Sequence, residues 1–366
     1  MNITVIGCGR WGSLITWYLD HIGHRVTLYG RAASPRMQAF LTTRQNDLLT
    51  LPESVALSTA LDAALESAET VIISIGSQSL RSLLGQSELQ ALRSRTVVLC
   101  MKGLEMGTGA RLSQIAAELL HPSNTVAVWL GPGHVQEFYR GIPNCMVIDS
   151  ENEDVKRRLV QAFSSDLIRF YYGGDIIGNE VGAAAKNVVG IAAGFLDGFE
   201  MSSLKGALMS RGTREVARLI KAMGGSELSA YGLCHLGDYE ATVFSPYSHN
   251  RQFGESFVRG QDYHQLAEGY YTVKALMLLG QRYGVELPIC KAVHDILYEQ
   301  AVPRDVLAGL LRRGLTEEFY DRHSRAGKKC IKKALSGHNA GRDFFITAGR
   351  RPETGGGGCV PPERRV

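Results

Sequence analysis

The feature that most limits the fold of this chain is a set of glycines close to its amino terminus. Gly7, Gly9 and Gly12 follow an apolar run at residues 3–6 and precede a helical pattern. Glycines at this spacing let the backbone approach a pyrophosphate, and the helix that follows presents its amino terminus to the negative charge. The segment predicts a dinucleotide site. A glycine-rich tight turn is the alternative, and it leaves the spacing unexplained.

Short β-branched runs alternate with helical patterns in the first part of the chain, as a parallel sheet wound by helices requires. Strands are expected at residues 3–6, 25–29, 70–75, 96–100 and 125–130, with weaker candidates at 146–148 and 167–171. Helices are expected between them at residues 12–21, 57–67, 80–92 and 110–120. We predict a Rossmann-type dinucleotide-binding domain over residues 1–178.

From about residue 179 the strand patterns disappear and long helical patterns follow. They cover residues 181–199, 205–223, 263–283, 289–300 and 303–312. The sequence therefore predicts an α/β Rossmann-type parallel-sheet domain followed by an all-α helical domain, residues 179–321, that carries substrate and catalytic groups.

Charge is distributed unevenly along the chain. The formal net charge is +4, but residues 322–366 hold 11 Lys and Arg against 3 Asp and Glu, so residues 1–321 carry −4. The Gly and Pro content of residues 322–366 predicts a mobile basic tail. A solubilising role is the simpler interpretation, and weak attraction to nucleic acid or to an acidic surface is the alternative. No specific nucleic-acid partner is expected.

The spacing of the cysteines and the hydropathy of the chain indicate in which cellular compartment the protein is expected. The seven cysteines are scattered without a Cys-x-x-Cys pair, so we expect neither a disulfide framework nor a metal site. The amino terminus lacks the pattern of a signal peptide. The longest apolar stretch, residues 181–196, is interrupted by Lys186 and Asn187 and is shorter than the ~20 residues of a membrane span. We predict a cytoplasmic protein with no membrane span.

The residues after the second expected strand bear on the choice of cofactor. An acid there binds the adenine-ribose hydroxyls and favours NAD, whereas an arginine can pair with a 2′-phosphate. The chain has Arg31 and Arg36 in this region and no acid until Asp47. NADP is therefore favoured over NAD. Stacking of Arg31 on adenine, without charge discrimination, remains the alternative.

Lys186 and Asn187 lie in the middle of an otherwise apolar helical pattern. A helix that is apolar all round is buried, and burial of an ammonium group lowers its pKa. A lysine with a lowered pKa suits general acid–base catalysis near neutral pH. A structural buried ion pair is the alternative.

Two other segments follow expected strands, at the edge where ligands of open α/β sheets bind. Lys102 comes just after residues 96–100 and is placed to touch substrate, although an exposed surface lysine is the alternative. Gly131, Gly133 and His134 follow residues 125–130, where backbone N–H groups can bind an anion.

A polar, glycine-bounded stretch at residues 237–254 supplies further candidates. Asp238 is a group that could orient or neutralise Lys186, while Asn250 and Arg251 suit phosphate. Taken alone, the stretch is predicted to be only a loop.

In order and spacing these motifs resemble the soluble NAD(P)-dependent glycerol-3-phosphate dehydrogenases over about residues 1–315. The shared motifs are the glycine pattern with Trp11, Lys102-Gly103, Gly131 to Glu137, Gly182 to Asn187, Leu208 to Gly212, Gly237-Asp238 with Thr242, Asn250-Arg251 with Gly254, Glu268-Gly269 and Glu286 to Ile289. No single motif would suffice, but nine in sequence are hard to assemble by chance.

The resemblance implies reduction of dihydroxyacetone phosphate to sn-glycerol 3-phosphate, a step of glycerophospholipid metabolism, by a homodimer. The implied catalytic residues are Lys186 as proton donor, Lys102 as its electrostatic partner, and Asp238. The implied substrate-binding residues are Lys102, Gly131, Gly133, Lys186, Asn187, Asp238, Thr242, Ser248, His249 and Asn250. The implied cofactor-binding residues are Gly7, Gly9, Arg10, Trp11, Gly12, Arg31, Lys102, Val135, His249 and Glu268.

The chain departs from the family pattern at three positions. His249 stands where the family usually has the arginine that clamps the phosphate, and Ser203 and Gly133 replace an asparagine and a Ser/Thr. These departures bear on substrate identity more than on fold. A reductase of a related polyol phosphate or hydroxy acid, or a dinucleotide-binding sensor without turnover, are the alternatives.

Overall fold

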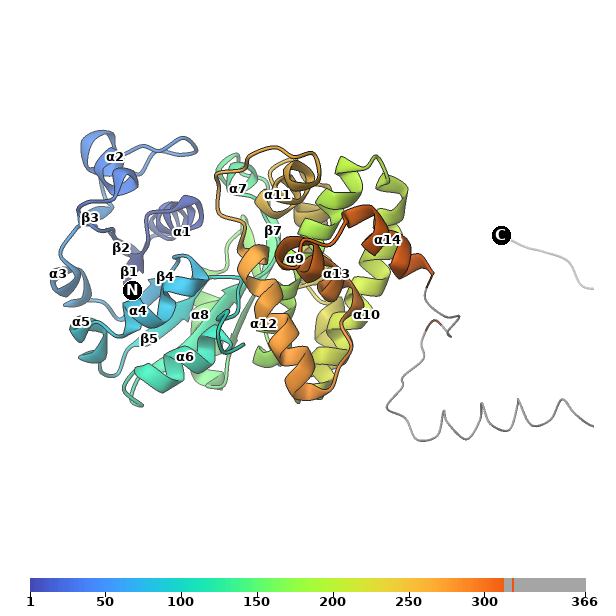
Figure 1. Ribbon diagram of the computed structural model, residues 1–366. Helices are drawn as coiled ribbons and strands as arrows, with labels where there is room; N and C mark the ends of the chain where they lie inside the picture. Colours follow the sequence, from blue (N-terminus) through green and yellow to red (C-terminus); the bar gives the residue numbers. More distant parts are fainter. Residues whose placement is uncertain (313–317, 319–366) are drawn as a thin grey trace, which may run out of the picture. The chain divides into compact units, whose positions relative to one another are not determined.

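The computed structural model describes residues 1–312 and Glu318, and residues 1–312 form one compact unit. The basic tail predicted over residues 322–366 lies outside the described residues. Within the unit, a sheet flanked by helices comes first in the chain, and a group of helices follows it (Figure 1). The predicted fold class is confirmed.

Eight strands form a single sheet in the order β3-β2-β1-β4-β5-β6-β7-β8. Their bounds are β1 Asn2–Ile6, β2 Arg25–Tyr29, β3 Ala56–Ser58, β4 Thr70–Ile73, β5 Thr96–Leu99, β6 Thr125–Leu130, β7 Asn144–Ser150 and β8 Ile168–Tyr172. All neighbouring pairs are parallel except β6 and β7, which are antiparallel. The central strands are buried on both faces, which explains their near-continuous Val and Ile runs.

Helices cover both faces of the sheet, and the loops that join them to the strands lie at the strand ends (Figure 1). They are α1 Arg10–His21, α2 Pro35–Thr43, α3 Leu61–Leu65, α4 Leu80–Leu84, α5 Ser87–Gln90, α6 Leu112–Leu119, α7 Val135–Tyr139 and α8 Glu153–Phe163. Strand β1 and helix α1 are joined directly by the glycine-rich loop, so the loop lies at the carboxyl edge of the central strands.

The helical part is built around α9, Ile176–Gly198, which is buried along almost its whole length. Against it pack α10 Lys205–Ala222, α11 His249–Val258, α12 Glu268–Tyr283 and α13 Pro288–Tyr298, and α14 Pro303–Leu311 packs against α13. Helices α9 and α11 touch backbone to backbone, because a Cβ on Gly254 would lie 2.2 Å from the carbonyl oxygen of Ile191. This contact carries the start of α11 close to the middle of α9.

Several sequence expectations were wrong in detail. Residues 57–67 begin as β3 and become helical only at Leu61, because Leu57 pairs with Leu28 of β2. Residues 80–92 form two short helices, and the helix expected from residue 263 begins at Glu268. The stretch compatible with a loop contains α11. Helix α9 begins at Ile176, and the division of the chain at residue 178 stays a prediction.

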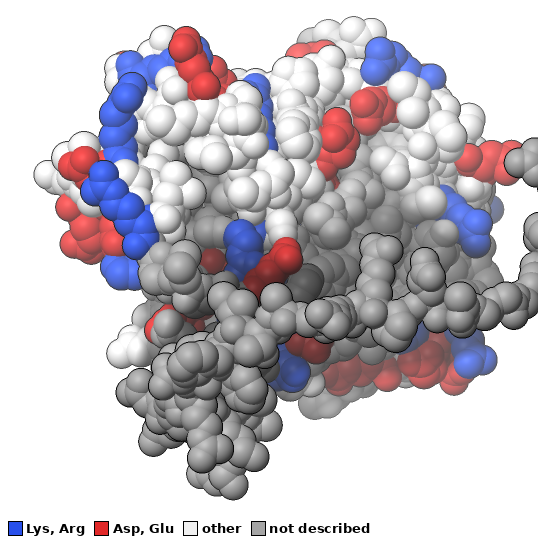
Figure 2. Space-filling model, turned by 90° about the vertical axis from the view of Figure 1, so that its right-hand side faces the viewer, with Lys and Arg blue, Asp and Glu red and all other residues white. Residues whose placement is uncertain are grey.

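Figure 2 views the helical part from the side and shows acidic and basic side chains next to one another on its described surface. Across the described residues, no helix is long and apolar enough to cross a membrane. The same residues contain no cluster of three or more His, Cys, Asp or Glu placed to hold a metal ion.

Candidate active site

Lys186 lies in the middle of α9 with only 7% of its surface exposed. Its Nζ lies 2.8 Å from Asp238 Oδ2 and donates a hydrogen bond of 2.8 Å to Thr242 Oγ1. Thr242 in turn donates to the backbone oxygen of Asp238 at 2.7 Å. The apolar helix therefore buries an ammonium group that is held in one position by two neighbours.

Asp238 joins this lysine to a second one that comes from the sheet. Its Oδ2 accepts a hydrogen bond of 2.7 Å from Lys102 Nζ, which also donates to the carbonyl oxygen of Gly131 at 2.6 Å. Asp238 is 1% exposed, and its Oδ1 has no hydrogen-bond partner among the described residues. One carboxylate thus neutralises two ammonium groups from different parts of the fold, while its second oxygen is a buried acceptor that calls for an explanation.

Burial is the main cause of the unusual acidity of Lys186. Desolvation, together with the positive charge of Lys102, lowers the pKa of Lys186 to about 8, although Asp238 opposes the shift. A lysine with this pKa exchanges its proton near neutral pH, as a general acid or base must. Desolvation likewise lowers the pKa of His134, whose Nε2 is buried without a partner in the described part of the chain.

The glycine-rich loop has the shape that a dinucleotide diphosphate requires. A Cβ on Gly12 would lie 1.9 Å from the carbonyl oxygen of Gly7, so the turn closes only with glycine at this position. A Cβ on Gly9 would have Arg36 Nη1 as its near neighbour, at 3.6 Å, so the outer side of the loop is open. Helix α1 begins directly after it with no acid in its first turn. The residues of this loop therefore fit the diphosphate of the predicted NAD(P) cofactor.

The other predicted cofactor residues surround the same strand ends. Lys102 Nζ lies 6.0 Å from the ring centre of Trp11, and Val135 opens α7 after the short loop, residues 131–134, that follows β6. Glu268 opens α12 and accepts hydrogen bonds from the backbone N–H and hydroxyl of Ser77. Arg31 is exposed in the loop after β2. These residues come from both the sheet and the helices.

The predicted substrate residues at the start of α11 are linked to Lys186 through its neighbour Asn187. Asn250 donates to Asn187 Oδ1 at 3.1 Å and accepts from the backbone of Gly269, while Asn187 donates to the carbonyl oxygen of Lys102. Ser248 caps α11 by accepting from the backbone N–H of Arg251. His249 lies 2.6 Å from Arg10 Nη1, a contact that the sequence pattern does not reveal.

Arg251, which the sequence made a candidate for binding phosphate, is engaged elsewhere. Its Nη1 pairs with Asp197 at 2.8 Å and with Glu255 at 3.1 Å, and its Nε donates to the carbonyl oxygen of Ser245. The guanidinium therefore holds α11 against the end of α9.

Gly133 has a physical reason for departing from the family pattern. Its φ is +140°, and a Cβ at this position would lie 2.2 Å from the ring of Phe138. A serine or threonine would strain the backbone and clash with the ring. Gly131 lies two residues earlier and is held by Lys102, as described above.

Two residues near the site were not among the predicted site residues. His134 was noted only as part of the glycine motif, although a histidine beside two glycines at a strand end is itself a signal for ligand contact. Tyr263, whose hydroxyl lies 2.7 Å from His249 Nδ1, gave no such signal because it precedes α12 in an irregular segment.

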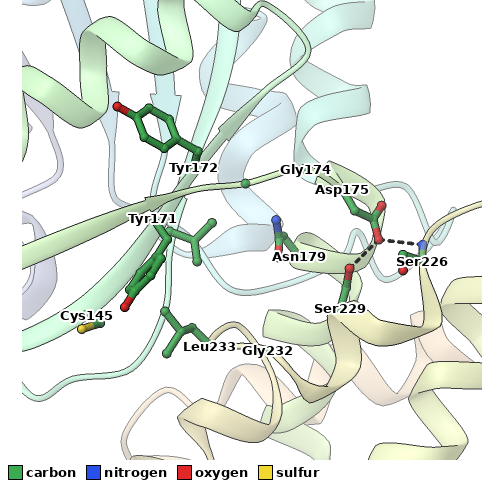
Figure 3. Close-up of a pocket in the computed structure, with 12 residues that line it drawn as sticks. Cys145, Tyr171, Tyr172, Gly174, Asp175, Asn179, Ser226, Ser229, Gly232 and Leu233 are labelled. Atoms are coloured by element: carbon green, nitrogen blue, oxygen red, sulfur yellow. Dashed lines mark hydrogen bonds between the residues drawn. The ribbon is translucent and has the colours of Figure 1, made fainter.

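A separate cavity of about 560 Å³ lies beside β7 and β8 (Figure 3). Asp175 at its rim accepts hydrogen bonds from the backbone of Ser226 and the hydroxyl of Ser229. None of the described residues that line this cavity belongs to the predicted site.

A glycine-rich loop between the first strand and helix of a Rossmann sheet, together with a buried lysine of lowered pKa, is typical of an NAD(P)-dependent dehydrogenase. The sequence matches the family models described as NAD-dependent glycerol-3-phosphate dehydrogenase N-terminus, over residues 2–156, and C-terminus, over residues 175–308. The chain belongs to the NAD-dependent glycerol-3-phosphate dehydrogenase family.

Individual relatives support this assignment. A protein of Thermoanaerobacter sp. named glycerol-3-phosphate dehydrogenase, NAD(P)+, is 32% identical over 331 residues, which cover 87% of this chain and 99% of the relative. A protein of Nitrosomonas europaea with the same name is 35% identical over 325 residues, 86% of this chain and 98% of the relative. The crystal structure of glycerol-3-phosphate dehydrogenase from Coxiella burnetii aligns with a TM-score of 0.79 at 27% identity, covering 85% of this chain and 99% of that chain.

Proposed function

We propose that this chain reduces dihydroxyacetone phosphate to sn-glycerol 3-phosphate with NADPH or NADH. The observation that carries the proposal is the arrangement of Lys186, Asp238 and Lys102 at the strand edge that also bears the glycine-rich loop. A carbonyl reductase needs a proton donor and a positive environment for the developing alkoxide, and the two lysines provide both.

The roles of the residues follow from their contacts. When bound, the reduced nicotinamide supplies a hydride to the carbonyl carbon. Lys186 donates its Nζ proton to the carbonyl oxygen, which becomes the hydroxyl of the product. Lys102 stabilises the negative charge on that oxygen, while Asp238 and Thr242 keep Lys186 oriented. We infer that Oδ1 of Asp238, which is buried without a partner among the described residues, accepts a hydrogen bond from a substrate hydroxyl when substrate binds.

Oxidation of NADPH and NADH, followed with dihydroxyacetone phosphate and with a panel of other phosphorylated and unphosphorylated ketones, tests the proposal. The proposal requires turnover with dihydroxyacetone phosphate to exceed that with the rest of the panel. Preference for another ketone would indicate the related-reductase alternative. Tight cofactor binding with no turnover on any ketone would indicate a sensor.

Within this function we propose a preference for NADPH, supported by Arg31 and by the lack of an acid directly after β2. Arg31→Ala should weaken NADPH binding by about 1.5 to 3 kcal/mol, the scale of a lost charge-assisted contact, and should affect NADH less. Titration of intrinsic fluorescence with each dinucleotide measures both affinities. Equal weakening of both would show that Arg31 stacks on adenine, and the preference would be withdrawn.

We also propose a cytoplasmic homodimer. The five cysteines in the described part of the chain are free thiols, as suits a reducing compartment. Light scattering coupled to size-exclusion chromatography tests the dimer, and fractionation of cells that express the full chain tests the location.

A further inference from the structure

A chain of hydrogen bonds connects the glycine-rich loop with the start of α11. Arg10 Nη1 lies 2.6 Å from His249 Nε2, and His249 Nδ1 lies 2.7 Å from the hydroxyl oxygen of Tyr263. Tyr263 in turn donates to Gln252 Oε1 at 3.2 Å. Arg10 and His249 are 239 positions apart in the sequence, so this contact exists only in the folded protein.

The chemistry of the four groups determines where the protons lie. A guanidinium has donors only, so His249 Nε2 must accept the hydrogen bond from Arg10. The ring proton is then on Nδ1 and is donated to Tyr263, whose own proton goes to Gln252. All three bonds are satisfied only when His249 is neutral. Burial and the charge of Arg10 also lower the pKa of His249 from its ordinary 6.5.

Arg10 differs from the other cations near α11. Lys186 pairs with Asp238, and Lys205 pairs with Asp197. Arg251 also pairs with Asp197. In contrast, no carboxylate among the described residues lies within ion-pair distance of the half-buried Arg10, whose hydrogen bond goes to an uncharged ring. A partly desolvated guanidinium without a counter-charge is suited to bind an anion, and its planar donors match a phosphate.

We propose that the Arg10 side chain binds a phosphate group, and that His249 positions Arg10 by accepting its hydrogen bond rather than by contacting the phosphate itself. Arg10 opens α1 beside the dinucleotide loop, whereas His249 precedes Asn250, which contacts Asn187 beside Lys186. The phosphate is therefore that of the substrate or that of the dinucleotide. The substrate case rests on the function proposed above.

Replacement of the guanidinium distinguishes the two phosphates. Arg10→Met should raise either the KM for dihydroxyacetone phosphate or the Kd of NADPH by about 10- to 100-fold, the effect of losing a charged hydrogen bond. A change in KM alone assigns the substrate phosphate, and a change in Kd alone assigns the dinucleotide. Arg259→Met, which removes an arginine at the carboxyl-terminal end of α11 that pairs with Glu255, is the matched control and should change neither. If Arg10→Met also changes neither constant, the proposal is wrong.

Two variants of His249 separate positioning from direct contact. His249→Gln retains an acceptor for Arg10 and a donor for Tyr263, so its KM at pH 7.5 should stay within about 3-fold of wild type. His249→Phe retains a ring but no acceptor, and its KM should rise by about 10-fold. If both variants raise KM equally, the acceptor is not what matters, and the positioning role is refuted.

The pH dependence provides a readout that a merely structural role would not change. Arg10 from α1 and Tyr263 from the segment before α12 face His249 directly, while Lys186 and Asp197 of α9 and Arg251 of α11 are bonded elsewhere. Protonation of His249 below its lowered pKa removes the acceptor, so KM should rise as pH falls. A histidine that gripped phosphate directly would instead bind best when acidic. The ratio of wild-type KM to that of His249→Gln removes the contribution of substrate ionisation.

A binding measurement keeps this proposal separable from the proposed function. Calorimetry of inorganic phosphate added to the NADPH-loaded wild type and to the NADPH-loaded Arg10→Met protein requires no turnover. Phosphate binding that is lost in Arg10→Met supports the role of Arg10 even if dihydroxyacetone phosphate is not reduced. Equal phosphate binding by both proteins, or no binding by either, overturns it when the NADPH affinity of the variant is also unchanged.

Discussion

Lys186→Met is expected to lower kcat for ketone reduction by at least about 100-fold, the scale of general acid catalysis, while NADPH affinity stays near that of wild type. Methionine fills nearly the same space in α9 but carries no proton to donate. Its effect on folding should be small, because Asp238 still pairs with Lys102 after the substitution. Steady-state kinetics and a fluorescence titration with NADPH measure the two quantities.

The pH profile of the wild type should identify the same group. Because burial lowers the pKa of Lys186 from 10.5 to about 8, the lysine is protonated below this value and neutral above it. The rate of reduction should therefore fall as pH rises through about 8, and the rate of glycerol 3-phosphate oxidation should rise. Both trends should be absent in Lys186→Met.

A matched control removes another buried lysine. Lys156 of α8 is 4% exposed and is bonded to Glu153 and to the carbonyl oxygen of Gly173, outside the site. Lys156→Met should retain kcat in its folded fraction even if it is less stable. A folded Lys186→Met protein with most of its activity would exclude Lys186 as the proton donor.

Asp238→Asn is the second substitution with a large expected effect. The substitution leaves the ammonium groups of Lys102 and Lys186 without a counter-charge. Loss of one partner from a buried ion pair lowers the free energy of unfolding by about 3 to 5 kcal/mol. Lys102 is partly exposed to solvent, which screens its charge. We therefore expect the free energy of unfolding to fall by about 3 kcal/mol, the lower end of this range. Chemical denaturation measures this loss.

The catalytic effect of Asp238→Asn has a definite sign. Asp238 raises the pKa of Lys186 against the effect of burial, so its removal should lower that pKa further. The reduction rate at pH 7.5 should then fall by about 10-fold or more, and a lower pH should restore part of it because Lys186 regains its proton.

Asp149→Asn provides the comparison for this variant. Asp149 is 2% exposed and accepts from Asn179 at 2.8 Å, away from the two site lysines. Its replacement should destabilise the protein without moving the pH profile of kcat. If Asp238→Asn and Asp149→Asn behave alike, with no displacement of the profile, Asp238 serves folding alone.

Local patterns were enough to predict the architecture. The glycines at 7, 9 and 12 and the β-branched runs report on backbone geometry within a few residues, which is why the Rossmann-type sheet and the helical part could be read from them. Errors arose where a neighbour distant in sequence decided the outcome. Leu57 is in a strand because Leu28 lies beside it, although the surrounding residues have a helical period.

The sequence by itself determined that Lys186 is buried, since the residues around it in α9 are apolar on every side. It could not determine which groups meet that lysine. Asp238 reaches both Lys186 and Lys102, and Arg10 reaches His249, only because α9, α11 and the strand ends pack together. Contacts between flexible side chains far apart in the chain depend on how these elements pack, and a periodic pattern contains no information about that packing. Tertiary structure therefore decided that His249 faces the guanidinium of Arg10.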